Sequence, residues 1–402
     1  MQRKWISLVG CKPASEEKNI MQTQTSLWVK AARPAWRSLA LVTCVLAVAF
    51  YAAAQGAHTC QTVPIVINID VPQNHQTQPV AISNTGYITG GYRGSDGRNH
   101  CFLRSPAGSY ADCEPTGVGA IASFGWSINT AGQLAGVYLD SSSVYHGFVR
   151  DADGSFVAPL DSPDGGTGTG QGTIADNINP TGEIAGEAID DNGVYHSFVW
   201  VNGTFTDFDV MGAGTGSGQG TQTATVDGLN PMGALVGTVV NSAGAWQGYV
   251  READGTIMCM VNAPGAGNGS GQGTSPGGIN QAGTIEGAYI DSNGVNHGFV
   301  GPACGTLTEY DVPGAGTSSG QGTGNGNINA LGEITANWVD SSNVSHGFVR
   351  EPDGMITKFD APGAGTGSGE GTYPYCNNAS GQVTGWYIDN LGKAHGFLRS
   401  CH

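Results

Sequence analysis

A histidine recurs in the short pattern H-x-F at intervals of about fifty residues. The positions are His100, His146, His196, His297, His346 and His395, with Gln247 in a seventh slot. Histidine binds metal ions and transfers protons near neutral pH. The pattern therefore raises three possible roles for this residue: metal binding, catalysis or architecture.

Aspartates accompany five of these histidines, each six residues upstream. They are Asp140, Asp190, Asp291, Asp340 and Asp389. A set of carboxylates on one face could hold cations or sugar hydroxyls, so these five residues are candidate ligand-binding groups. The interpretation that we favour is turn chemistry, because aspartate often accepts hydrogen bonds from its own backbone where a turn begins.

Glycine-rich segments form a third recurring feature, at 165–173, 212–221, 265–274, 314–323 and 363–372. They do not match a phosphate-binding loop, because no lysine and no helix pattern follows and the glycines alternate. They also lack the calcium-binding β-roll period. We expect the glycines to let a crossover fold tightly between strands. Contact of exposed backbone amides with a ligand stays open.

The elements that carry these residues repeat too. A marker G-x-[I/L/V]-x-G begins at Gly86, Gly132, Gly182, Gly233, Gly283, Gly332 and Gly381, with Ala336 replacing the last glycine of one copy. Three residues before these glycines stand Asn129, Asn179, Asn230, Asn280, Asn329 and Asn378, with Ser83 in the first copy. Three markers in a fixed order indicate a repeat protein of seven units.

The sequence of each unit predicts four short antiparallel strands. Val, Ile, Thr, Tyr and Phe occur in short alternating runs, and Gly, Asn and Asp mark the turns between them. Such units of about fifty residues predict an all-β fold, a seven-bladed β-propeller. The last unit lacks its fourth strand, and the segment 63–72 has the pattern of one. We therefore expect the N-terminal strand to complete the last blade and close the ring. This strand order places the aspartate turns and the glycine-rich crossovers on one face.

The combined motif, I-N-x-x-G-x-I-x-G-x-Y followed by His, a small residue and Phe, resembles the HAF-type extracellular repeat, with glycine mostly in place of alanine. The resemblance covers residues 64–400. It implies secretion and a β-rich repeat, and it brings no activity and no catalytic residues.

The architectural role of the histidines follows from the expected ring. Residues in the same slot of successive blades spread around the ring instead of converging on one ion at about 2.0–2.1 Å. We expect each histidine, and Gln247, to donate a hydrogen bond within its own blade. The sequence thus predicts no metal, no other cofactor and, because G-x-S-x-G and H-E-x-x-H are absent, no catalytic residues.

The first 54 residues are a separate region. Basic residues precede an apolar run at 39–54 that ends in small residues, as in a secretory signal cleaved near residue 54. A retained anchor is the alternative, and Met21 is a possible start. The remaining domain, 55–402, has nine Lys and Arg against thirty Asp and Glu, a formal net charge of −21. We expect no attraction to nucleic acid, no membrane insertion after signal removal, and a monomer.

Seven cysteines follow residue 54, and export favours disulfides over metal ligands. Cys101 and Cys113 flank a turn centred on residue 107, so antiparallel pairing sets them opposite each other. Further candidates are Cys60 with Cys401 and Cys259 with Cys304, which would leave Cys376 free.

The function predicted from these features is an exported or cell-surface propeller that binds a glycan or an extracellular protein without catalysis. The alternative is an extracellular polysaccharide hydrolase or lyase. A glycosidase needs two carboxylates about 5–9.5 Å apart, and the nearly uniform loops do not reveal such a pair.

Overall fold

The computed structural model describes residues 65–68, 70–71, 76–224 and 227–400. This part of the chain contains strands and turns and no helix, so the all-β prediction is confirmed. Within it, no helix is long and apolar enough to cross a membrane. The predicted signal segment, residues 1–54, lies outside the described residues.

The strands form seven antiparallel groups, which we call units 1 to 7. Unit 1 contains β2 (Thr77–Ile82), β3 (Ile88–Arg93), β4 (Asn99–Arg104) and β5 (Tyr110–Asp112). Unit 2 contains β6 (Ala122–Ile128), β7 (Leu134–Leu139), β8 (Tyr145–Arg150) and β9 (Phe156–Leu160). Unit 3 contains β10 (Gly172–Ile178), β11 (Ile184–Ile189), β12 (Tyr195–Val201) and β13 (Thr204–Phe208). Unit 4 contains β14 (Gly220–Thr223), β15 (Leu235–Val240), β16 (Trp246–Arg251) and β17 (Ile257–Val261).

The second half of the chain continues the series. Unit 5 contains β18 (Gly273–Ile279), β19 (Thr284–Ile290), β20 (Asn296–Pro302) and β21 (Thr308–Tyr310). Unit 6 contains β22 (Gly322–Ile328), β23 (Ile334–Val339), β24 (Ser345–Arg350) and β25 (Ile356–Phe359). Unit 7 contains β26 (Gly371–Asn377), β27 (Val383–Ile388), β28 (Ala394–Ser400) and, from the other end of the chain, β1 (Ile65–Asn68).

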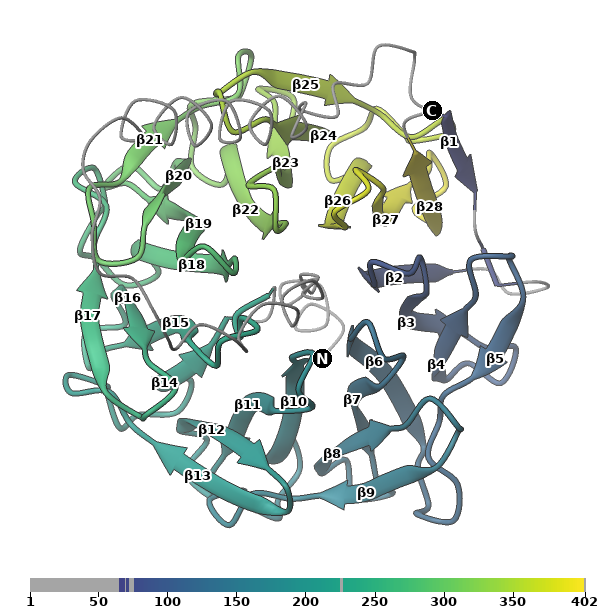
Figure 1. Cartoon of the computed structure of the whole chain (residues 1–402). Helices are drawn as coiled ribbons and strands as arrows, with labels where there is room; N and C mark the ends of the chain where they lie inside the picture. The colour runs from purple at the N-terminus through teal and green to yellow at the C-terminus, as the bar shows by residue number, and fades with distance from the viewer. Residues whose placement is uncertain (1–64, 69, 72–75, 225–226, 401–402) are drawn as a thin grey trace, which may run out of the picture.

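The units are arranged around a common centre, with the first strand of each unit innermost (Figure 1). β1 pairs antiparallel with β28, so that Ile65 lies opposite Ser400 and Asn68 opposite Phe397. Hydrogen-bonded pairing does not run around the whole circle, because β2 to β5 form a sheet of their own beside one 24-stranded sheet. The chain thus has a propeller architecture in which the N-terminal strand pairs with the last unit.

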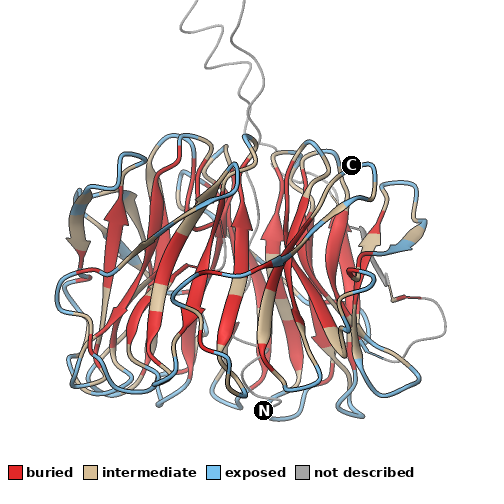
Figure 2. Ribbon diagram, turned by 90° about the horizontal axis from the view of Figure 1, so that it is seen from below, coloured by how far each residue is buried: buried red, intermediate tan, exposed pale blue. Residues whose placement is uncertain are grey.

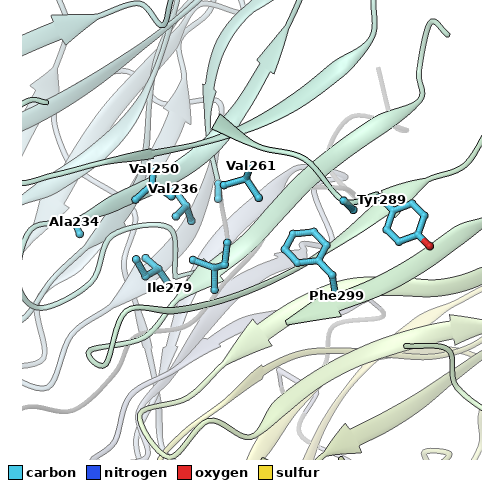
Figure 3. Packing of buried hydrophobic residues seen from close by; sticks show 10 residues of the cluster. Ala234, Val236, Val250, Val261, Ile279, Tyr289 and Phe299 are labelled. Atoms are coloured by element: carbon cyan, nitrogen blue, oxygen red, sulfur yellow. The ribbon is translucent and has the colours of Figure 1, made fainter. Parts of the chain in front are cut away.

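The core lies between the units, and the exposed residues gather in the loops at both ends of the strands (Figure 2). The phenylalanine of each H-x-F triplet is at most 1% exposed, and Tyr249 fills that slot in unit 4. Figure 3 shows one such cluster, in which Val236 and Val250 of unit 4 lie near Ile279 and Phe299 of unit 5. Full burial of a side chain of this kind stabilises a fold by about 1.5–3 kcal/mol.

The recurring asparagine makes two sets of hydrogen bonds. Its Oδ1 accepts hydrogen bonds within the turn, as when Asn280 Oδ1 accepts from the backbone N–H groups of Ala282 and Thr284 at 3.0 Å. Its Nδ2 donates to the backbone carbonyl of the matching residue in the next unit, at 3.0–3.4 Å. These links run from Asn129 to Asn179, Asn230, Asn280, Asn329, Asn378 and finally Ser83. One residue type therefore shapes the turn and fastens neighbouring units, including unit 7 to unit 1.

The crossovers between units are held by a threonine at the start of the inner strand. Thr173 Oγ1 accepts from the backbone N–H of Ser162 at 2.8 Å, and Thr77 Oγ1 accepts from that of Val71 at 3.0 Å. The glycine just before Thr173 is required, since Gly172 has a φ of +112° and a Cβ there would lie 2.1 Å from the Tyr145 carbonyl oxygen. The segment that follows β1 is thus tied to unit 1 in the way that other crossovers are tied.

Two predicted disulfides are present. Cys101 is bonded to Cys113 with a Cα separation of 5.2 Å, and Cys259 is bonded to Cys304 with a Cα separation of 5.8 Å. Cys376 is also disulfide-bonded, so the expectation of a free thiol at this position is wrong. That expectation came from pairing the other cysteines by elimination. Cys60 and Cys401 lie outside the described residues.

Candidate functional site

Each repeated histidine lies between two carboxylates of its own unit. Its Nδ1 is 2.7–3.2 Å from a carboxylate at the end of the fourth strand. The pairs are His100 with Glu114, His146 with Asp161, His196 with Asp209, His297 with Asp311, His346 with Asp360 and His395 with Asp70. A carboxylate can only accept, so Nδ1 carries a hydrogen in all six units.

The other ring nitrogen faces the turn between the second and third strands. Nε2 lies 3.1–3.9 Å from an aspartate there. The pairs are His100 with Asp96, His146 with Asp140, His196 with Asp190, His297 with Asp291, His346 with Asp340 and His395 with Asp389. We call each carboxylate–histidine–carboxylate group a rim triad. The structure thus brings the predicted aspartates and histidines together, unit by unit.

The turn aspartates are largely occupied by their own backbone. Asp140 Oδ1 accepts from the N–H groups of Ser142 and Val144 at 2.8 and 2.9 Å. The hydrogen bond from Val144 is the main reason that the pKa of Asp140 is lowered, and the one from Lys393 does the same for Asp389. With one oxygen bound in the turn and the other near the imidazole, these aspartates have little capacity left for a ligand.

The carboxylates on the fourth strands are more accessible. The side chains of Asp161, Asp209, Asp311 and Asp360 are 43–52% exposed. These residues were not among the sequence-predicted candidates. Their signal was a recurring Asp before a small residue and a Pro or Met, as in D-S-P, D-V-M, D-V-P and D-A-P.

An aromatic residue of the second strand supports most of the histidine rings. The rings stack with centroids 4.4–5.3 Å apart. The pairs are Tyr92 with His100, Tyr138 with His146, Tyr289 with His297, Trp338 with His346 and Tyr387 with His395. Four of these aromatic residues are at most 7% exposed, so they act as a floor under the imidazole and leave the carboxylates as the accessible part of the triad.

Charge on the histidines depends on their surroundings. Burial alone would lower the pKa of His395, but the hydrogen bonds and charges of Asp70 and Asp389 outweigh it and raise the pKa. The same balance raises the pKa of His100 beside Asp96 and Glu114 and that of His196 beside Asp209. Protonation of these rings changes the charge of a triad from −2 to −1.

Unit 4 replaces all three members by neutral amides. Asn241 occupies the turn position, Gln247 the histidine position, and Asn262 the fourth-strand position, since Gly248 pairs with Val261. Asn241 Oδ1 still accepts from two turn N–H groups, at 2.9 and 3.1 Å. All three positions of the triad are therefore uncharged in unit 4.

The glycine-rich crossovers use their own amides. In the first of these loops the N–H groups of Gly166, Gly168 and Gly170 donate to Ile189 O, Gln171 Oε1 and Ser143 O respectively. Gln171 Nε2 donates to the backbone carbonyl of Asp191 in the next unit at 2.9 Å. These donors are therefore not available to a phosphate or another anion, and the loop instead links two neighbouring units.

Two pairs of buried carboxyl groups break the repeat, Asp227 with Glu286 and Asp176 with Glu187. Asp176 is the extra residue of a β-bulge in β10, and Glu187 lies on the paired strand β11. They are 1% and 2% exposed. Burial, and then the charge of Glu187, raise the pKa of Asp176 well above its usual range. The same two slots hold Trp126 and Val137 in unit 2, so the centre differs between units.

No set of three His, Cys, Asp or Glu side chains in the described part of the chain is arranged to hold a metal ion. Each rim triad offers hydrogen-bond acceptors and negative charge at the surface. The Asp176–Glu187 pair is enclosed.

Comparison with known proteins bears on the fold. No family model and no curated protein matches the chain. Among solved structures, it is similar to the BP39L lectin from Burkholderia pseudomallei, with a TM-score of 0.52 and 12% identity over 79% of this chain and 95% of the lectin. It also matches a puromycin hydrolase with a TM-score of 0.48 and 14% identity over 81% of this chain and 54% of the hydrolase. The β-propeller domain of Cps50 (Swd1) from Myceliophteria thermophila matches with a TM-score of 0.45 and 8% identity. At 12% identity the likeness to the lectin concerns the fold alone.

Proposed function

We propose that this protein is an exported seven-bladed β-propeller, closed by β1, that binds a glycan through the face carrying the rim triads and has no catalytic activity. The single observation that carries the proposal is repetition. Six units present the same triad at the same place, with carboxylate side chains up to 52% exposed. Carboxylate oxygens accept hydrogen bonds from sugar hydroxyls, and a repeated site suits a repeated ligand because linked contacts add avidity.

Closure has its own support. β1 pairs with β28, Val71 is tied to Thr77 in the manner of the other crossovers, and Asp70 completes the triad of His395. Asn378 Nδ2 also donates to the Ser83 carbonyl, which joins unit 7 to unit 1. The segment at β1 therefore supplies the strand pairing, the crossover hydrogen bond and the carboxylate that the fourth strand supplies in the other units.

Export is supported by the two disulfides, which persist in oxidising compartments. The cleaved signal near residue 54 and the resemblance to the HAF-type repeat stay predictions.

A polysaccharide hydrolase or lyase is the second candidate, favoured by one observation, the asymmetric pair Asp176 and Glu187. Catalysis needs contact with the glycosidic bond, and side chains that are 1–2% exposed cannot touch a polymer. The geometry therefore favours binding.

The test is a glycan array probed with purified residues 55–402, followed by a reducing-sugar assay on every glycan that binds. We expect saturable binding and no release of reducing ends. Turnover that survives in the rim-triad variant D161N/D311N/D360N but is lost in D176N would replace binding by catalysis as the function. An array without any signal would overturn the choice of a glycan as ligand.

A further inference from the structure

Two glutamates meet at the end of unit 6 that lies opposite the rim triads. Glu333 precedes β23 and Glu351 follows β24, and the pairing of Ile334 with Arg350 sets the two glutamates opposite each other. They are 3% and 6% exposed, and Glu351 Oε2 is buried without a hydrogen-bond partner.

Unit 2 shows what this position normally contains. Gln133 and Asp151 occupy the equivalent slots, since Leu134 pairs with Arg150. Gln133 Oε1 accepts from Asn129 Nδ2 at 2.9 Å, and Gln133 Nε2 donates to Asp151 Oδ1 at 2.7 Å. The glutamine thus accepts on one side and donates on the other.

Glu333 accepts a hydrogen bond from its turn asparagine, as Gln133 does in unit 2. Glu333 Oε2 accepts from Asn329 Nδ2 at 2.7 Å. The remaining carboxyl oxygen stands where the amide nitrogen of Gln133 donates in unit 2, and the residue opposite, Glu351, again carries a carboxyl group. Two ionised carboxylates enclosed side by side repel each other, and a carboxyl group can donate only when it is protonated, so this arrangement favours one proton on the pair.

The pair faces charged groups from two units. Asp353 on the hairpin of unit 6 adds negative charge, and Arg399 on β28 of unit 7 adds the opposing positive charge. Arg399 is 3% exposed and lies over the ring of Phe359, 4.8 Å from its centroid. A pair that holds one proton has a single negative charge, which Arg399 can balance. A pair without a proton has two.

The same place joins units 6 and 7. Asn377 Nδ2 donates to the Glu333 carbonyl at 3.1 Å, and Asn329 Nδ2 donates to the Asn378 carbonyl at 3.0 Å. Arg399 itself lies opposite Val66 of β1. Any change at the glutamate pair therefore acts on the joint beside the N-terminal strand.

We infer that Glu333 and Glu351 share one proton and that this proton makes the joint between units 6 and 7 sensitive to pH. Burial, and then the charge of Glu333, raise the pKa of Glu351 to about 7. A carboxyl whose pKa is higher in the folded than in the unfolded chain stabilises the fold in acid and loses this effect as the pH rises through the folded value. The contact between units 6 and 7 is thus more stable below neutral pH than above it.

The experiment compares the melting temperatures of purified wild type, E333Q and E183Q between about pH 4, below the unfolded pKa of a glutamate, and about pH 8.5. E333Q restores the permanent amide donor found in unit 2. Glu183 is the matched control, because it also accepts from its turn asparagine, Asn179, but faces Val201 instead of an acid.

We expect E333Q to melt with the wild type at the acidic end and at least about 2–4 °C above it at the alkaline end, since one pKa unit alone produces such a shift in a domain of about 150–250 residues. E183Q should keep the wild-type slope. Should E333Q fail to fold, E351Q replaces the donor from the other side and is expected to flatten the profile equally. The inference is overturned if the folded variant keeps the wild-type slope, or if E183Q flattens the profile as much.

Discussion

Unit 4 and the other six units solve the same local problem with different chemistry. Asn241, Gln247 and Asn262 stand where the others have two carboxylates and a histidine, and the turn hydrogen bonds of Asn241 are retained. The strands of unit 4 pair in the same order. A polar acceptor in the turn is therefore enough for the fold, and the charges of the rim triads are a separate property that six units keep and one lacks.

The largest expected effect concerns β1. Unit 7 is the unit whose fourth strand comes from the other end of the chain. Removing residues 55–72 exposes the edge of β28 and removes Asp70 from its triad. An exposed strand edge invites association, so we expect aggregation or melting at a much lower temperature, measured by calorimetry and light scattering. A truncated chain that stays monomeric with an unchanged melting temperature would show that β1 does not close the fold.

Two substitutions at His297 test whether a glutamine, as in unit 4, can replace the histidine of the other units. H297A should lower the free energy of unfolding by roughly 0.5–1.5 kcal/mol, because the hydrogen bond to the partly exposed Asp311 is lost. H297Q should cost less, since an amide can still donate there, as the glutamine of unit 4 could. Denaturant melts measure both. The architectural role of His297 would be abandoned if H297A melted normally yet abolished ligand binding or released a metal ion.

The smallest effect comes from giving unit 4 the missing charges. The triple variant N241D/Q247H/N262D should fold with a stability within about 0.5 kcal/mol of wild type, as for surface substitutions that keep their hydrogen bonds. It should also increase ligand binding by adding a seventh triad. A variant that unfolds would mean that unit 4 tolerates only neutral groups and that its amides are required by packing.

Much of the fold was predictable because each marker has a local physical meaning. The glycine four positions into the turn, such as Gly132 with a φ of +83°, and the alternating strand that follows define the unit without reference to its neighbours. β1 was predictable for the same reason, since its sequence has the pattern of a fourth strand.

The sites were less predictable, because they depend on register. Asp161 and His146 are 15 residues apart in sequence and meet only because Gly147 pairs with Leu160. The link from Asn129 to the Asn179 carbonyl needs the distance between two units. Asp176 occupies a bulge that recurs in the inner strands of units 1, 2, 3, 5 and 7, and the pairing of β10 with β11 brings Glu187 near it. Sequence periodicity thus predicts the units, whereas contacts across strands and between units require coordinates.

The central claim is that the exposed carboxylates of the rim triads bind the ligand, and the most direct measurement is affinity after their removal. The variant D161N/D311N/D360N keeps hydrogen-bond acceptors for the histidines and removes three charges. The control D153N/D254N/D353N removes three charges from the hairpins at the opposite ends of the strands. By calorimetric titration with the glycan found on the array, we predict at least about tenfold weaker binding for the first variant, equivalent to about 1.4 kcal/mol, and unchanged binding for the control. Equal affinities for both variants and the wild type would contradict the account.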